Sequence, residues 1–279
     1  MKKFALSFQY SVIREDVPKC MRMITKWMNR MFLKINPDKT EILLLYPEML
    51  EDHVIIRGVI IDEQCIRFSK YVKNVGLWLD GNLNFNHHVN KIVSHCFKLL
   101  KDIGRVRAML SRKHTEMLVH AVSSTRMDYC NSVLFNMNKS NINKLQKVQN
   151  AAARLVVQKR KRESISATLR ELHWLRIESR IIFKILLLVH KYVQGKFPSN
   201  LSLPYKSVNC RPGDFLMLHE KSCKTKYGKR TFTYAAPRLW NALPPDVRKT
   251  DKIETFKSMV KTILFQDTEG FQRKAFKYN

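Results

Sequence analysis

The sequence predicts an α+β fold that is mostly α-helical, in which short strands are confined to the first 80 residues. Hydrophobic residues make up 45% of the 279-residue chain and aromatic residues 10%, so there is enough apolar material for a packed core. Up to residue 80 the apolar residues form short runs separated by turn residues, which is typical of strands. Beyond residue 80 they recur every three or four positions, which is typical of amphipathic helices.

The first element is predicted to be a helix that begins after Glu15-Asp16. Acidic side chains can cap the free amides of a first turn, and Pro18 suits that turn because its missing amide costs no hydrogen bond there. Apolar residues then recur on one face as far as Met31. We expect the methionines of this face to fill the core.

Three strands are predicted next, at 42–46, at 54–61 with Gly58 inside, and at 70–79 with alternating apolar residues. Helices are then predicted at 89–106, from a Ser111 cap towards Tyr129, from a Ser140 cap towards Leu155, at 165–172, and at 177–193 ending at Gly195. Proline, glycine and polar residues multiply from Phe197 onward. We therefore expect a loop-rich end with a last helix near 253–265.

The strongest compositional feature is positive charge. The chain has 51 Lys and Arg against 23 Asp and Glu, a formal net charge of +28. Residues 1–80 carry 13 basic and 10 acidic side chains, whereas residues 81–191 carry 21 and 6 and residues 192–279 carry 17 and 7. Such an excess favours a polyanionic partner, either nucleic acid or an anionic membrane, and of these nucleic acid is the expected one. A basic surface that merely keeps the protein soluble is the alternative.

Other compositional features argue against several classes of site. The most apolar run is interrupted by Lys184, so no membrane span and no membrane partner are expected. The six cysteines lack zinc-ligand spacing, so no metal site is predicted, and Cys96 falls on an apolar helical stripe. The N-terminus has no long apolar region typical of a secretory signal. We expect an intracellular protein, in the nucleus or the cytoplasm.

Two groups of basic residues are candidate phosphate contacts. The first lies on or near the polar face of the predicted helix 89–106, where Asp102 is the one acidic residue, and comprises Lys91, Lys98, Lys101, Arg105 and Arg107. The alternative is a solvated helix face. The second is the run Lys159, Arg160, Lys161 and Arg162, which suits phosphate contact, a nuclear import signal or a plain loop equally well.

Several motifs follow one another along the chain: LKINPDKTE at 33–41 after Trp27-Met28, VKNVGLWLD at 72–80, MDYCN at 127–131, LQKVQNAAAR at 145–154, LHWL at 172–175, RIIFK at 180–184 and APRLWNALP at 236–244 with Phe256-Lys257. Taken together and in this order, they resemble the last part of the reverse transcriptase of LINE-type (non-LTR) retrotransposons, in particular the jockey-like and chicken-repeat-like groups. The resemblance implies a remnant of the polymerase palm with its primer-grip hairpin at 1–80, a helical thumb at 81–137 and a family-specific, helical C-terminal region at 138–279. It also implies an RNA template and a DNA primer, or an RNA–DNA duplex, as partners.

The family polymerises with two Mg²⁺ ions held by an aromatic-Ala-Asp-Asp box. This sequence contains no Asp-Asp pair, and its adjacent acidic pairs, Glu15-Asp16, Glu51-Asp52 and Asp62-Glu63, are not part of such a box. Leu6-Ser7-Phe8 resembles the residues that follow the box in relatives. We therefore expect the catalytic strand to precede Met1, with no catalytic residue and no cofactor in this chain.

The resemblance gives two further residues a possible role in binding. Lys39 matches a lysine that can protonate departing pyrophosphate, although a solvated turn lysine is the alternative. Gly76 matches the primer grip, where a glycine lets the backbone approach a primer end, and a strand bulge is the alternative. Trp78 is expected either to stack on a base or, more commonly, to be core.

Some polar residues are expected to have no catalytic role. His87, His88 and His95 are expected at the surface. Asp128, Tyr129 and Asn131 are expected to form a structural corner in which side chains cap backbone groups.

Three functions remain open on the sequence. The first is a truncated reverse-transcriptase fragment that binds RNA or RNA–DNA duplex and does not polymerise. The second is a piece of an intact, active reverse transcriptase, and the third is a domesticated protein-interaction module. No particular protein partner can be inferred. Residues 81–193 are expected to be the more stable part.

Overall fold

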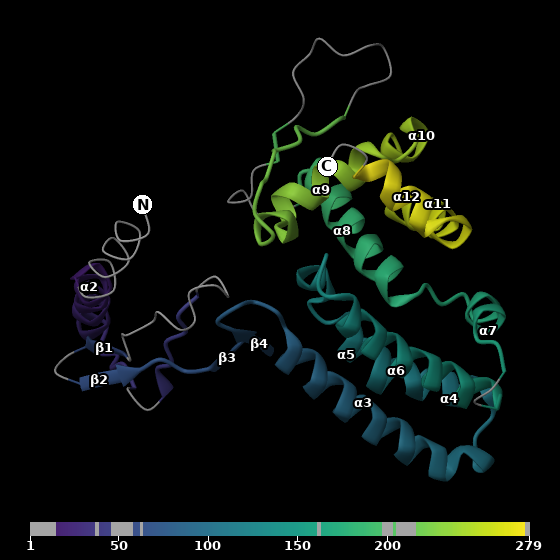
Figure 1. Cartoon of the computed structure of the whole chain (residues 1–279), viewed down its shortest axis with the longest axis horizontal. Helices are drawn as coiled ribbons and strands as arrows, with labels where there is room; N and C mark the ends of the chain where they lie inside the picture. Colours follow the sequence, from purple (N-terminus) through teal and green to yellow (C-terminus); the bar gives the residue numbers. More distant parts are fainter. Residues whose placement is uncertain are drawn as a thin grey trace. The chain divides into compact units, whose positions relative to one another are not determined.

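A computed structural model describes residues 15–36, 39–45, 58–61, 64–160, 163–196, 203–204 and 216–276. The chain divides into two compact units, Met1–His88 and Val89–Asn279. Helices dominate, and the strands form two small antiparallel sheets in the first unit (Figure 1). The predicted mostly helical α+β class is confirmed. The finer domain boundaries at 80/81 and 137/138 stay predictions.

The first described element is helix α2, Val17–Arg30, and it confirms the predicted helix with a proline in its first turn. Asp16 makes no side-chain capping bond, and no residue of the helix is buried. Met23 is 68% exposed and Trp27 57%. The prediction that these methionines fill the core is therefore wrong, because helical spacing creates an apolar face whether or not another element covers it.

Two hairpins follow α2. Strand β1, Gly58–Ile61, pairs antiparallel with β2, Gln64–Arg67, which was not predicted. Strand β3, Tyr71–Asn74, pairs antiparallel with β4, Leu77–Asp80.

The strand predicted at 70–79 is thus a hairpin. Its turn is Val75-Gly76, with φ of 45° and 84°. Two successive residues with positive φ reverse the chain tightly, while the apolar alternation continues through such a turn, so the pattern resembles one strand. The strand predicted at 42–46 is reduced to an isolated bridge between Ile42 and Phe68 among the described residues, and 46 and 54–57 lie outside them.

Asp80 closes the loop between β4 and helix α3, Asn86–Val106. Its buried carboxylate accepts the amide hydrogens of Asn84 at 2.9 Å and Phe85 at 2.8 Å. In the first turn of α3, His88 is 3% exposed, so the prediction that it lies at the surface is wrong. Its Nδ1 accepts the backbone amide of Trp78 at 3.4 Å. Burial, and secondly the charge of His87, lower the pKa of His88 because both disfavour the imidazolium.

The helix predicted from Ser111 to Tyr129 is confirmed, with one irregular turn. It comprises α4, Arg112–Val119, the π-helical turn η5, His120–Ser124, and α5, Thr125–Asp128. The Ser111 hydroxyl accepts the amide hydrogen of His114 at 3.2 Å, as a helix cap does. Cys96 on α3 is fully buried, as predicted, and its Sγ lies 3.9 Å from the Ser123 carbonyl oxygen.

Helix α6, Lys139–Val157, is capped by Asn138 rather than by the predicted Ser140. The Asn138 side chain accepts the amide hydrogen of Ser140 at 3.1 Å, which starts the helix two residues earlier. Leu145, Val148 and Ala152 are buried as predicted.

The remaining elements of the second unit are also mostly helices. Two short 3₁₀ turns, η4 at Arg107–Met109 and η6 at Asn131–Leu134, connect the earlier helices. Helices α7, Ser166–Glu171, and α8, Ile177–Val193, confirm the predicted pair.

The C-terminal part is more helical than predicted. Beside the predicted α11, Ile253–Gln266, it contains the 3₁₀ turn η7, Gly228–Arg230, and helices α9, Phe232–Asn241, α10, Pro245–Arg248, and α12, Thr268–Ala275. Pro237 lies inside α9. The hydrogen bond lost there is offset by burial, since Leu239 and Trp240 are fully buried.

Candidate nucleic-acid interface

The predicted basic row lies on the exposed face of α3. Lys91, Lys98, Lys101 and Arg105 are all exposed. At 100° per residue they fall within an arc of about 80°, and they extend over about 21 Å of helix. The opposite face is buried through Val89, Cys96, Leu100 and Ile103. Burial of that stripe fixes which side of the helix meets solvent.

Little negative charge offsets this row. Arg105 pairs with Asp102 at 3.0 Å, with both side chains about half exposed or more. Within the described ranges, Lys91, Lys98 and Lys101 form no ion pair with a carboxylate. An exposed ion pair such as Arg105–Asp102 has a small interaction energy, and Asp102 neutralises at most one charge of the row. The positive potential of at least three lysines therefore remains on this face.

Helix α6 adds lysines beside α3 that the sequence analysis did not select. Lys144 donates to the Asn90 side-chain oxygen at 2.8 Å, which places it against the first half of α3. Lys147, one turn later, is exposed. The sequence could have indicated these lysines, because residues 139–157 contain no Asp or Glu. On a long helix without acidic residues, all the charged side chains of the polar face are positive.

Arg107 was grouped with the row, but its guanidinium is engaged elsewhere. Nε donates to the Leu155 carbonyl and Nη2 to the Val156 carbonyl, both at 2.9 Å, and Nη1 donates to Leu110 at 2.7 Å. Two of these acceptors belong to the last turn of α6. A cation there satisfies carbonyls that have no partner within the helix and opposes the negative end of its dipole.

The run at 159–162 is only partly described. Lys159 donates to the Thr168 hydroxyl at 2.8 Å, and the backbone amide of Arg160 donates to Glu163 at 2.7 Å. Lys161 and Arg162 lie outside the described residues. The described half of the run therefore lies against the start of α7.

Lys39 and Gly76 belong to the Met1–His88 unit. Lys39 is exposed, and its backbone amide donates to Asn36 at 3.2 Å. Gly76 is an exposed turn residue, so its positive φ serves the hairpin reversal rather than a strand bulge. Trp78 is half-buried, with its ring edge-on to His87 at 5.2 Å between centroids.

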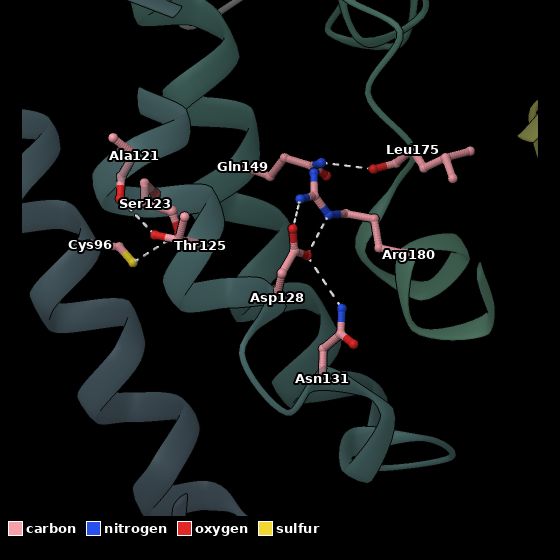
Figure 2. Close-up of polar contacts among 9 residues, drawn as sticks. All are labelled: Cys96, Ala121, Ser123, Thr125, Asp128, Asn131, Gln149, Leu175 and Arg180. Atoms are coloured by element: carbon pink, nitrogen blue, oxygen red, sulfur yellow. Dashed lines mark hydrogen bonds and ion pairs between the residues drawn. The ribbon is translucent and has the colours of Figure 1, made fainter. Parts of the chain in front are cut away.

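The corner at Asp128 was predicted to cap backbone groups, but the contacts described for Asp128 are to side chains, and its main partner lies on α8 (Figure 2). Arg180 donates Nε to one carboxylate oxygen at 2.8 Å and Nη2 to the other. Asn131 donates to Asp128 at 3.3 Å. Nearby, Gln149 of α6 donates to the Leu175 carbonyl at 2.8 Å. These bonds join α5 to α8, and α6 to the residues just before α8.

The described part of the chain contains neither a metal-binding cluster nor a membrane-spanning helix. No three His, Cys, Asp or Glu side chains gather there into a group that could hold a metal ion. None of its helices is both long enough and apolar enough to cross a membrane.

Comparison with known proteins finds a weak and partial similarity. The chain is 28% identical, over 145 residues, to a protein of Drosophila melanogaster described as "Probable RNA-directed DNA polymerase from transposon BS". The match covers 48% of this chain and 15% of that protein. No family model matches the chain, and no solved structure matches it. The similarity therefore relates part of this chain to a small part of a transposon reverse transcriptase.

Proposed function

We propose that this chain binds RNA or an RNA–DNA duplex through the exposed face of α3, as part of a non-LTR retrotransposon reverse transcriptase. The observation that carries the proposal is the row Lys91, Lys98 and Lys101, which is exposed and has no carboxylate partner in the described structure. The description of the Drosophila relative as an RNA-directed DNA polymerase supports the choice of nucleic acid.

The chemistry of the row suits phosphates rather than bases. Each lysine is a point charge on a flexible stem, and a straight row of about 15 Å from Lys91 to Lys101 can follow the phosphates along a duplex. Phosphate contacts position a protein without reading sequence. Binding should therefore be tolerant of sequence and strongly weakened by salt, because each neutralised phosphate releases a counterion.

We further propose that the chain does not polymerise by itself. Polymerisation needs carboxylates that hold two metal ions between them. The sequence has no Asp-Asp pair, and its acidic pair Asp62-Glu63 follows Ile60-Ile61, where the family has an aromatic residue and an alanine.

The test is a titration of a fluorescent RNA–DNA duplex over a range of salt concentrations. The variant replaces Lys91, Lys98 and Lys101 with glutamine. Its matched control replaces the exposed Lys249, Lys252 and Lys274, which removes the same charge from elsewhere in the same unit. The α3 variant should lower the slope of log affinity against log salt by about 2 to 3, and the control should leave it nearly unchanged.

An equal effect of both variants would show that net charge, and not the α3 face, governs binding. Nucleotide incorporation in a primer-extension assay with Mg²⁺ would overturn the second proposal. A protein complex that survives nuclease and high salt would favour the interaction module instead.

A further inference from the structure

A second cationic surface lies just before α9, outside every residue selected from the sequence. Between 219 and 231 the chain carries five basic residues and a single acid, Glu220. Lys221, Lys224 and Lys226 are exposed and Lys229 is half-exposed. The segment runs beside α9 in the green part of the chain (Figure 1). We call Lys221, Lys224, Lys226 and Lys229 the lysine segment.

The backbone before the lysine segment is fixed by polar side chains of α9. Trp240 donates its indole N–H to the Leu216 carbonyl at 2.7 Å. The Asn241 side chain accepts the amide hydrogen of Leu218 at 2.9 Å and donates to its carbonyl at 2.8 Å. Leu218 is fully buried. Together with the hydrogen bond from the His219 amide to the Pro204 carbonyl at 2.8 Å, these bonds give a segment with little regular structure a defined path.

The one acid of the segment is used by α9 and does not neutralise the lysines. Glu220 accepts from Asn241 at 2.9 Å and pairs with Arg238 at 3.8 Å. Arg238 is mostly buried, lies 3.9 Å from the Tyr234 ring centroid, and donates to the Lys221 carbonyl at 3.0 Å. In the described structure the lysine segment itself forms no ion pair.

The second half of the segment is held by a compact turn. The Thr225 hydroxyl accepts the amide hydrogen of Gly228 at 3.0 Å, and the Thr225 carbonyl accepts that of Lys229 at 3.1 Å. Arg230 then donates to the Asn136 carbonyl at 3.2 Å, which ties the turn to the loop after η6. Half-exposed Tyr227 lies between Lys226 and Lys229.

From this arrangement we infer that the lysine segment is a second nucleic-acid contact, which binds single-stranded RNA or DNA. Four like charges held on a fixed path repel one another unless a polyanion neutralises them. Lysines on an irregular stretch and the turn that follows it, with an aromatic ring among them, suit a strand whose phosphates and unpaired bases are both accessible. In a duplex the faces of the bases are already stacked on one another, so no base is available to stack on the ring of Tyr227. The inference rests on the proposed function, because it takes nucleic acid as the partner.

The experiment uses the full chain and two probes, an unstructured single-stranded RNA and an RNA–DNA duplex without overhangs. The segment variant replaces all four lysines with glutamine. A control variant replaces the exposed residues Lys249, Lys252, Arg273 and Lys274, which removes the same charge. Replacement of the four lysines with arginine keeps the charge and should keep binding. Circular dichroism checks that each variant retains its helices.

The segment variant should lower the salt slope for single-stranded RNA by about 3, given about 0.7 per phosphate contact, and should leave duplex binding near that of the wild type. Wild-type binding of both probes by this variant would overturn the inference, as would an equal loss in the charge-matched control. The proposed function would survive either result if the α3 variant still lost duplex binding. Segment-dependent binding to phosphatidylserine vesicles, with no effect on RNA, would also overturn the inference and would identify an anionic membrane as the partner.

Discussion

Arg107 offers a direct test of whether a basic residue beside the α3 row binds phosphate or holds the fold. Its three donors contact the carbonyls of Leu110, Leu155 and Val156 at 2.7 to 2.9 Å, and its side chain is half-buried. Replacement by methionine keeps much of the apolar stem and removes all three bonds. We expect the protein to lose stability and to keep its affinity for nucleic acid.

The magnitude follows from the contacts. A hydrogen bond to a charged group contributes about 1.5–3 kcal/mol net, and a cation at a helix C-terminus adds about 0.3–1 kcal/mol. The contacts are half-exposed, so water replaces some of the lost bonds, and the expected loss is about 2–4 kcal/mol rather than the full sum. For a unit of this size, that loss lowers the melting temperature by roughly 10 °C.

The assay measures urea denaturation and the salt dependence of duplex binding in Arg107→Met and in Arg105→Met. Arg105 is 67% exposed and pairs with an exposed Asp102, so its loss should change stability by less than about 1 kcal/mol. If it contacts phosphate, its loss should lower the salt slope by about 0.9. The two arginines, two residues apart, should therefore show opposite effects. A stable Arg107→Met protein with a reduced salt slope would refute the structural role.

Two further predictions concern polar contacts that are buried on at least one side. Asp128→Asn should lower stability by about 2 kcal/mol, because Arg180, 16% exposed, loses the charge of its partner while Asp128 itself stays 40% exposed. A double-mutant cycle with Arg180→Met checks this, and additive losses would show that the pair is not coupled. The lowered pKa of His88 means that the folded state disfavours its protonation, so its contribution to stability is present above pH 6.5 and is lost as the pH falls below that value through the folded-state pKa. Hydrogen-exchange protection of the Trp78 amide should follow this loss, and the same pH dependence in His88→Gln would contradict the assignment.

Local patterns predicted those elements whose signals involve near neighbours. Apolar residues spaced three and four apart predicted helices α3 and α8, and Ser111 predicted the start of α4. In each case the residues that carry the signal lie within one or two turns of the element that they predict. The same reasoning failed at Ser140, because Asn138, two residues earlier, is an equally good cap and the sequence does not rank the two. It failed again at α9, which lies in the part of the chain predicted to be loop-rich; burial of Trp240 maintains the helix around Pro237.

For the candidate interface, the sequence predicted which face of α3 is cationic but not which cations are available. Lys91 and Lys98 are exposed, as a polar stripe opposite an apolar one implies. Arg107 differs from them because α6, nearly fifty residues later, brings two carbonyls to its guanidinium. Likewise, the charge of the lysine segment was visible in the sequence, but its fixed path depends on Asn241 and Trp240.

The sequence by itself determined the helical class, the positive charge, the approximate positions of the long helices and the absence of an Asp-Asp pair, because each depends on composition or on residues a few positions apart. The tertiary structure decided that His88 is buried, that Arg107 caps α6 and that Glu220 is paired with Arg238 of α9. These depend on which distant side chains and carbonyls pack together. A cation is free to bind phosphate only where folding has brought no carboxylate or carbonyl within its reach.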